Sequence, residues 1–430
     1  MALNTDITLR NKVIYSVFVR NYSKAGTFHK VQEDLERIKQ LGVDIIWLMP
    51  IHPLGEKNRK GALGSPYAIR DYRAVNPEFG TMEDFDALVD AIHEKGMKVI
   101  IDVVYNHTSP DSWLQQNHPE WFYKKPDGSF GNHVGDWWDI IDLDYTQREL
   151  WDYQIETLQM WAKKVDGFRC DVATLVPLPF WLEARKRVAE VNPQCLWLSE
   201  SVEPEFIRHL RSQGLWAASD SEIFQAFDMT YDYDIFGDFT KALTGEGTLA
   251  AYLDKVNGQE SIYPANYVKL RCLENHDRAR AACVIPDDRA LRNWTAFLYF
   301  LKGATMIYNG QEVCCQERPS LFDKDTIVWN TGKDISPLLR SLYAIKQDPL
   351  LTDSSFEAEE MGNGVIFAQH KKGKQRLVGL FASKGQPCVV RADVPDGRYV
   401  NLIDGKVVVA EQGLVTVSGE PAIIRIDAEE

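Results

Sequence analysis

The stretch "DGFRCDVATL", residues 166–175, predicts a buried strand and indicates where the chemistry lies. Its apolar residues are typical of a short buried strand, and Arg169 and Asp171 stand two positions apart near its end. Residues two apart on a strand point to the same face of a sheet, so the guanidinium and the carboxylate should meet. A buried strand that ends in a cation and a carboxylate indicates a functional site at its carboxyl end.

Similar apolar runs recur along the chain, and segments of helical period separate them. Eight strands that alternate with helices predict an α/β fold, a closed (β/α)₈ TIM barrel rather than an open doubly wound sheet. One helical segment opens with Thr81 three residues ahead of Asp84, a capping signature, and closes on Gly96. The expected strands lie within 13–19, 43–51, 98–107, 166–173, 196–201, 225–231, 267–277 and 304–312, and the helices include 31–42, 81–96 and 146–164.

Two segments depart from this alternation. Residues 107–145 are rich in Gly, Pro, Asp and Trp and are too long for an ordinary loop, so we expect a subdomain inserted after the third strand. After about residue 350 strand-like runs with turn signals predict a C-terminal antiparallel β-sandwich domain. The predicted domains are the catalytic barrel at 1–106 and 146–348, the inserted subdomain at 107–145 and the β-sandwich at 349–430.

Composition limits the partners that the protein can have. Its 430 residues carry a net charge of −14, which argues against nucleic acid or an anionic membrane surface as a partner. No stretch approaches the roughly 20 apolar residues needed to span a bilayer, and the start "MALNTDITLR" lacks the apolar core of a signal peptide. The seven cysteines lack C-x-x-C spacing, so neither a disulfide framework nor a cysteine metal cluster is expected. These features predict a cytoplasmic protein.

The active face of such a barrel lies at the carboxyl ends of its strands. Asp171, Glu200 and Asp277 end the fourth, fifth and seventh expected strands, so three carboxylates converge on one mouth. Carboxylates brought close together cannot all ionise freely, because like charges raise the pKa of at least one. The other polar residues at strand ends are Asp102, Asn106, His107, Arg169, Glu274, Asn275 and His276.

Such a cluster suits the cleavage of a glycosidic bond. One carboxylate attacks the anomeric carbon while a protonated carboxylic acid donates to the leaving oxygen, and a short separation gives retention of configuration. Arg169 beside Asp171 favours the ionised form that a nucleophile requires, which leaves Glu200 to carry the proton. A buried ion pair without catalytic use is the alternative for Arg169 and Asp171, and the two further strand-end carboxylates argue against it.

Several ordered motifs also resemble those of the α-amylase superfamily, glycoside hydrolase family 13: "GVDIIWLMPI", "SPYAIRDY", "DVVYNH", "GFRCDVA", "LSES", "ENHD" and "GATMIYNGQE". The resemblance covers residues from about 13 to 345 and implies that Asp171 is the nucleophile, Glu200 the general acid/base and Asp277 the transition-state stabiliser. It further implies that the histidines contact sugar hydroxyls, that Tyr67 stacks on the sugar ring, and that Asp102 orients its neighbours. The residues implied in substrate binding are Tyr67, His107, Arg169 and His276.

The sequence departs from the family pattern at several positions. Thr174 and Leu175 stand where many α-amylases carry Lys-His, and Ala68 stands where oligo-1,6-glucosidases carry an acidic residue that anchors a chain end. Asn106 matches a calcium ligand of the family, but the altered Lys-His segment usually completes that site. We therefore expect no metal and no required cofactor, with calcium as the candidate ion. Carboxylates available near Asn106 are Asp136, Asp139, Asp142 and Asp144.

The sequence as a whole predicts a cytoplasmic, retaining α-glucan hydrolase that acts on maltodextrin-like oligosaccharides. The nearest alternative is a transglycosylase or isomerase of the trehalose synthase or glucanotransferase type, because the same covalent intermediate serves both reactions. An oligo-1,6-glucosidase or a cyclomaltodextrinase is a further alternative. A non-catalytic glucan-binding relative is disfavoured because all three carboxylates are present. Linkage preference, endo or exo action and oligomeric state depend on loop shapes that do not follow from composition.

Overall fold

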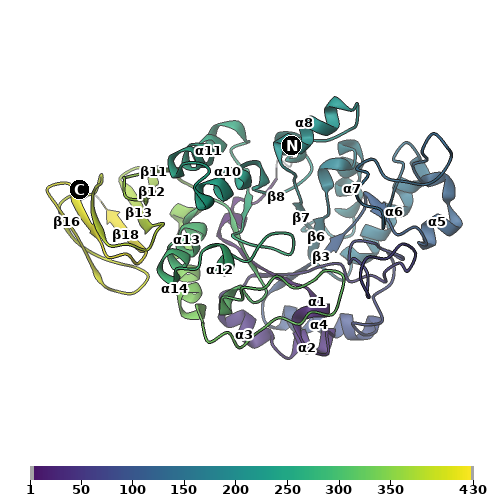
Figure 1. Ribbon diagram of the computed structural model, residues 1–430, viewed down its shortest axis with the longest axis horizontal. Helices are drawn as coiled ribbons and strands as arrows, with labels where there is room; N and C mark the ends of the chain where they lie inside the picture. Colours follow the sequence, from purple (N-terminus) through teal and green to yellow (C-terminus); the bar gives the residue numbers. More distant parts are fainter. Residues whose placement is uncertain (1–3, 428–430) are drawn as a thin grey trace.

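The computed structural model describes residues 4–427 and has a closed eight-stranded barrel at its centre (Figure 1). Its strands pair in parallel in the order β1-β10-β9-β8-β7-β6-β3-β2. This topology confirms the predicted (β/α)₈ barrel. The strands are β1 (Val13–Val17), β2 (Ile45–Leu48), β3 (Lys98–Val103), β6 (Gly167–Cys170), β7 (Leu196–Ser199), β8 (Met229–Tyr231), β9 (Lys269–Arg271) and β10 (Ala304–Tyr308).

Helices in the connections between the strands surround the barrel. In α4 (Met82–Glu94), Thr81 accepts a hydrogen bond from the N–H of Asp84 at 3.2 Å, and Asp84 accepts one from the N–H of Thr81 at 2.8 Å, as the capping signature predicts. Within residues 4–427 no helix is both long and apolar enough to cross a bilayer. The other helices of the barrel region are α1 (Val19–Tyr22), α2 (Phe28–Gln32), α3 (Leu35–Gln40), α6 (Arg148–Ala162), α7 (Leu178–Val188), α8 (Pro204–Ser212), α9 (Asp220–Ile223), α10 (Tyr233–Thr244), α11 (Leu249–Ile262), α12 (Ala281–Val284), α13 (Asp288–Phe300) and α14 (Ser336–Lys346).

One predicted helix is divided in two. The sequence pattern predicts a continuous helix over 31–42, but α2 ends at Gln32 and α3 begins at Leu35. Asp34 lies between them with φ −101° and ψ 2°, and its carboxylate accepts hydrogen bonds from the Tyr22 hydroxyl and from Nε of Arg37. The N–H of Asp34 donates to the carbonyl of Val31, three residues back, at 3.1 Å, so the regular bonding to the fourth residue back is interrupted at this point.

The segment after β3 forms a small unit beside the mouth of the barrel. β4 (His107–Thr108) pairs antiparallel with β5 (Ile141–Asp142), and α5 (Trp113–Asn117) lies between them in the chain. The Tyr72 hydroxyl donates to the carbonyl of His107 at 2.7 Å and so ties this unit to the loop after β2. In Figure 1 the unit with α5 lies at one end of the molecule and the C-terminal sheets lie at the other.

Beyond α14 the chain forms two four-stranded antiparallel sheets, β11-β12-β13-β18 and β14-β17-β16-β15, which confirm the predicted C-terminal β-sandwich. Phe367, Leu380 and Val415 are among the buried residues that form a core between the two sheets. His370 is buried at the junction with the barrel, where its Nε2 lies 2.8 Å from the carbonyl of Phe300 at the end of α13. The strands are β11 (Ser355–Glu360), β12 (Val365–Lys372), β13 (Gln375–Ala382), β14 (Cys388–Arg391), β15 (Gly397–Val400), β16 (Val407–Glu411), β17 (Leu414–Val417) and β18 (Ala422–Asp427).

Candidate active site

A pocket of about 450 Å³ opens at the carboxyl ends of the barrel strands. Asp171 directly follows β6, Glu200 directly follows β7, and Asp277 lies in the loop after β9, so carboxylates from three strands meet in it. The structure thus gathers residues that are up to 262 positions apart in the chain, from Lys60 to Phe322. Six of the seven predicted site residues line the pocket: Tyr67, His107, Asp171, Glu200, His276 and Asp277.

Arg169 lies beneath the floor of the pocket rather than on its wall. Its side chain is fully buried, and its Nη1 donates to Oδ1 of Asp102 and to Oδ1 of Asp171, each at 2.9 Å. Nη2 lies 2.8 Å from Oε1 of Glu200 and forms an ion pair with it. The sequence predicts Arg169 as a substrate-binding residue. Because the carboxylates that it pairs with cover it, Arg169 is instead a positioning residue for those carboxylates.

The turn after β6 brings Asp171 and Glu200 together. The strand ends at Cys170, and the N–H of Asp171 donates to the carbonyl of Val103 at 2.9 Å, which extends the parallel pairing by one residue. Val172 then adopts a left-handed conformation, φ 35° and ψ 44°, which is rare for a β-branched residue. In this conformation its N–H donates to Oε2 of Glu200 at 2.8 Å, so the strained turn orients the Glu200 carboxyl beside Asp171.

Burial and repulsion shift the ionisation of these two carboxyls. Burial raises the pKa of Glu200 to about 7, with repulsion from Asp171 adding to the shift and Arg169 opposing it. Burial also raises the pKa of Asp171, while Arg169 and a hydrogen bond with the Glu200 carboxyl lower it in part. The pair can therefore share one proton near neutral pH, with Glu200 as its carrier and Asp171 as the ionised partner.

Asp277 reaches the pocket from the loop after β9. Asn275 Oδ1 accepts hydrogen bonds from the N–H groups of Asp277 at 2.9 Å and Arg278 at 3.0 Å, which shapes this turn. Burial opposes ionisation of Asp277, but attraction to His276, whose Nε2 lies 3.1 Å from Oδ2, outweighs it and, with nearby arginines, lowers the pKa of Asp277 to about 2. Asp277 is therefore ionised at neutral pH, whereas the carboxyl of Glu200 is not fully so.

Aromatic and imidazole contacts fix the remaining predicted residues. The Tyr67 ring stacks on that of His276 with centroids 5.4 Å apart, and its hydroxyl lies 2.7 Å from Nε2 of that histidine. His107 is buried, with its ring 5.7 Å from Trp137 and its Nδ1 3.1 Å from Nδ2 of Asn106. Burial lowers the pKa of His107, so this imidazole is neutral at pH 7.

Several residues that line the pocket have no recognisable signal in the sequence. They come from the inserted segment and from the loops after β2, β7, β8 and β10, and the course of these loops in space decides which side chains face the cavity. Only a structure or a comparison of related structures could have found them. They include Lys60, Ser65, Trp137, Ile140, Val202, Glu203, Phe206, Tyr233, Leu321 and Phe322.

Two of the carboxylates expected near a calcium site, Asp139 and Asp142, are engaged by nitrogen donors. Oδ1 of Asp139 lies 2.7 Å from Nζ of Lys60, and Oδ2 of Asp142 lies 2.7 Å from both the main-chain N and Nδ1 of His133. Nδ2 of Asn106 faces Oδ1 of Asp142 at 3.5 Å. Ammonium and N–H groups at these positions do not fit Ca²⁺, which requires a shell of oxygen ligands. Across residues 4–427 no group of three or more His, Cys, Asp or Glu side chains is placed to hold a metal.

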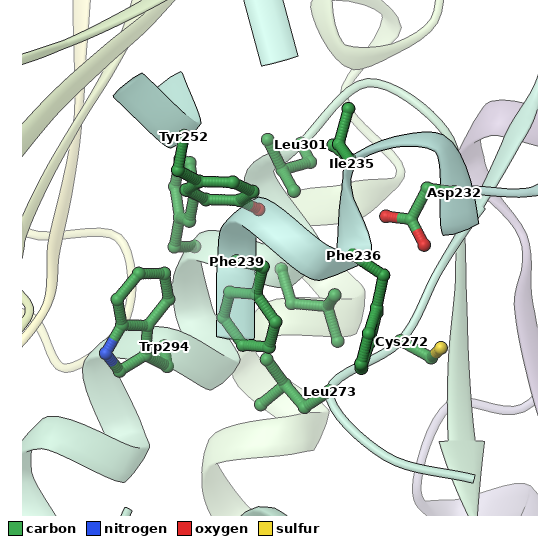
Figure 2. A pocket seen from close by; sticks show the side chains of 11 residues that line it. Asp232, Ile235, Phe236, Phe239, Tyr252, Cys272, Leu273, Trp294 and Leu301 are labelled. Carbon is green, nitrogen blue, oxygen red and sulfur yellow. The ribbon is translucent and has the colours of Figure 1, made fainter. Parts of the chain in front are cut away.

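Figure 2 shows another cavity, which lies among α10, α11 and α13 and is lined mainly by apolar side chains such as Phe236, Phe239 and Trp294. Burial raises the pKa of Asp232, at the edge of this cavity, to about 6. The space amounts to about 10 Å³, roughly enough for one water molecule, and none of the predicted site residues lines it. This cavity is therefore not a candidate active site.

Two solved structures are similar to this chain over nearly its whole length. A crystal structure of an α-amylase from Lactobacillus plantarum is 50% identical, with a TM-score of 0.95, and the match covers 98% of this chain and 100% of that one. A crystal structure of a noncanonic maltogenic α-amylase, AmyB, from Thermotoga neapolitana is 33% identical, with a TM-score of 0.87 and coverage of 98% and 100%.

Longer proteins are similar over part of their length. An α-1,4-glucan:maltose-1-phosphate maltosyltransferase from Myxococcus xanthus is 31% identical over 56% of this chain and 37% of its own length. The α-amylase MalA from Haloarcula japonica is 27% identical over 74% of this chain and 46% of its own, so the chain spans less than half the length of these two relatives. Residues 357–424 match the bacterial α-amylase C-terminal domain, and residues 14–364 match the α-amylase catalytic domain. Because the match to the catalytic domain covers most of the chain, this protein belongs to the α-amylase family.

Proposed function

We propose that the protein is a retaining glycoside hydrolase that cleaves α-glucosidic bonds in maltodextrin-like α-glucans by double displacement. The observation that carries the proposal is that one guanidinium binds both carboxyls: Nη1 of Arg169 donates to Oδ1 of Asp171 at 2.9 Å, and Nη2 lies 2.8 Å from Oε1 of Glu200. Inverting glycosidases need about 6.5–9.5 Å between their carboxyls to hold a water molecule, whereas retaining enzymes need about 5 Å. Carboxyls bound by the two terminal nitrogens of one guanidinium lie close together, which supports retention.

The chemical steps follow from the ionisation of the three carboxyls. The Asp171 carboxylate attacks the anomeric carbon and forms a C–O bond as the bond to the leaving oxygen breaks, and Glu200 gives its proton to that oxygen. Glu200 then takes a proton from water, whose oxygen displaces Asp171, so the acid is regenerated. The negative charge of Asp277, whose pKa is lowered to about 2, stabilises the oxocarbenium-like transition state.

An uncharged α-glucan is the substrate class that the surroundings favour. The similar proteins are named as α-amylases and as an α-1,4-glucan transferase. Among the described residues that line the pocket, the lysine is Lys60, and its ammonium is paired with Asp139 at 2.7 Å. A phosphate group on a sugar would need an ammonium or guanidinium free to bind it. The paired lysine therefore favours a neutral oligosaccharide over a sugar phosphate.

Transfer of the glycosyl group to a second sugar is the other candidate reaction. Val172, Val202 and Phe206 present apolar surface beside Glu200, on the side where the leaving group departs. A sugar acceptor can pack on such surface, whereas water gains nothing from it. The names of the maltosyltransferase relatives point in the same direction, and the products decide between the two reactions.

We also propose that activity needs no metal ion or cofactor, because nitrogen donors engage the carboxylates of Asp139 and Asp142. The proposed location is the cytoplasm. The seven cysteines are free thiols, which suits a reducing compartment.

Replacing Asp171 with Asn tests the proposal. Turnover of maltotriose should fall by at least about 10³-fold, because the nucleophile is lost. The thermal midpoint should not fall, since burial raises the pKa of Asp171 and its charge therefore destabilises the folded state. Asp254→Asn, on the exposed face of α11, is the matched control and should keep wild-type turnover. Glucose and maltose as wild-type products indicate hydrolysis, and longer chains indicate transfer. An Asp171→Asn variant that retains near-normal turnover contradicts the proposal.

A further inference from the structure

One side of the pocket is closed by residues 60–65 of the loop after β2, here called the wall segment. The N–H of Leu63 donates to the carbonyl of Phe322 at 2.9 Å, and the N–H of Ala62 donates to Oδ1 of Asp323 at 2.8 Å. Gly61 adopts φ 63°, and a Cβ atom there would lie 2.6 Å from that of Phe322, so the two loops touch along their backbones. The wall segment is therefore joined to the loop after β10.

A buried arginine reinforces this junction from below. Nη1 of Arg20 donates to the carbonyl of Gly64 at 2.9 Å and to the carbonyl of Leu321 at 3.1 Å. One guanidinium thus holds both loops at fixed positions, and its side chain is 2% exposed, which protects these bonds from competition with water.

The other end of the wall segment is joined to the inserted unit. Nζ of Lys60 lies 2.7 Å from Oδ1 of Asp139 and 5.3 Å from the centroid of the Trp138 ring. Both charged side chains line the pocket, and that of Asp139 is only 5% exposed, so solvent screens this ion pair little. The loop after β10, the wall segment and the inserted unit consequently form a continuous barrier along this side.

Two parts of the barrier, the wall segment and the loop after β10, lie on the side away from the leaving group. In the ring of strands, β2 and β10 flank β1, and β1 is diametrically opposite β7. Glu200, Val202 and Phe206 follow β7, and the leaving oxygen must face Glu200 to receive its proton. The part of the glucan that stays bound to Asp171 therefore extends toward the barrier.

We infer that the pocket binds the non-reducing end of a glucan chain and releases a short glycone, so the enzyme acts from the chain end rather than within the chain. Lys60 and Asp139 are the specificity-determining residues: their ammonium and carboxylate stand where the terminal sugar presents its hydroxyl groups. The volume of about 450 Å³, shared by glycone and leaving group, suits a bound fragment of a few sugars. This inference rests on the proposed function and specifies its substrate end.

The experiment compares two maltoheptaosides, one free and one with its non-reducing end capped as a 4,6-O-acetal. Wild-type enzyme should cleave the free substrate and release glucose or maltose from its non-reducing end, with at least about 100-fold lower turnover of the capped substrate. Similar rates on both substrates, with internal cleavage, would overturn the inference and leave the proposed function standing. Failure to cleave either substrate would overturn the proposed function itself.

A variant of the barrier locates the selectivity. Lys60→Ala should raise turnover of the capped substrate at least about tenfold and lengthen the products. Its turnover of the free substrate and its thermal midpoint show that the variant is folded. Lys57→Ala, an exposed lysine of the same loop, is the control and should leave the ratio of the two rates unchanged. If wild-type enzyme rejects the cap but Lys60→Ala rejects it equally, the role assigned to Lys60 is wrong.

Discussion

Replacing Glu200 with Gln tests the proton donor, and the structure sets the size of the effect. Burial raises the pKa of Glu200 from its ordinary value of 4.5 to about 7. At about 1.4 kcal/mol per pKa unit, the site favours the protonated acid by about 3 kcal/mol. At pH 7 about half of the molecules therefore carry the proton, compared with about 0.3% for an unperturbed glutamate, a difference of about 150-fold. The wild-type kcat/KM should accordingly fall as the pH rises above about 7.

The assay separates proton transfer from nucleophilic attack. Glu200→Gln should hydrolyse maltotriose about 10²–10⁴-fold more slowly than the wild type, because the leaving oxygen receives no proton. With α-maltosyl fluoride, whose leaving group needs no proton, the variant should release a burst of fluoride equal to the enzyme concentration, since Asp171 is intact. Later turnovers should be slow for lack of a general base, and azide should restore them because it attacks without one.

A matched control and a clear contrary result complete this test. Glu205→Gln changes an exposed glutamate on α8, close to the same pocket in the chain, and should keep wild-type kinetics on both substrates. Maltotriose hydrolysis by Glu200→Gln within about tenfold of the wild-type rate, or the absence of a fluoride burst, would refute the reasoning. In either case Glu200 could not be the group that carries the proton.

Two further predictions concern metal and acid. Exhaustive treatment with EDTA should change neither turnover nor thermal midpoint, because Lys60 and His133 engage the carboxylates that would bind calcium; a loss that added Ca²⁺ reverses would contradict this. Burial lowers the pKa of His370 from 6.5 to about 3, so its contribution to stability is complete above pH 6.5 and is lost as the pH falls toward 3, by up to about 1.4 kcal/mol per pH unit. Denaturant unfolding of His370→Gln should show a flatter dependence over this range, whereas the exposed His209→Gln should match the wild type.

The barrel was predictable because its local signals agree with one another. Apolar runs such as that of β3, helices with caps such as that of α4, and the alternation of the two all favour the same topology. The exact ends of the helices and strands were less predictable from the sequence. The predicted helix over 31–42 breaks at Asp34, whose carboxylate binds Tyr22 and Arg37, and one of these partners lies 12 residues away.

The carboxylates at the strand ends were predictable, and the loop residues that form the sides of the pocket were not. Asp171 and Glu200 stand at the ends of adjacent strands, so the topology alone brings them to one mouth. The burial of Arg169 beneath them depends on which carboxylates close over it, and the sequence does not show that. The partnership of Lys60 and Asp139 depends on the course of two long loops, for which the sequence holds no periodic signal.

Arg169 binds carboxylates that neighbouring strands supply, so the active site is complete only when the strands of the barrel have paired. Asp102, Arg169 and Glu200 belong to three consecutive strands of the sheet, and without the guanidinium among them the carboxylates would repel one another. Asp277, which follows β9, joins them only when β8 has paired with β7 and β9 has paired with β8. A refolding chain with an open ring would recover its helical circular dichroism before it recovered any turnover, so the enzymatic rate serves as a built-in reporter of closure.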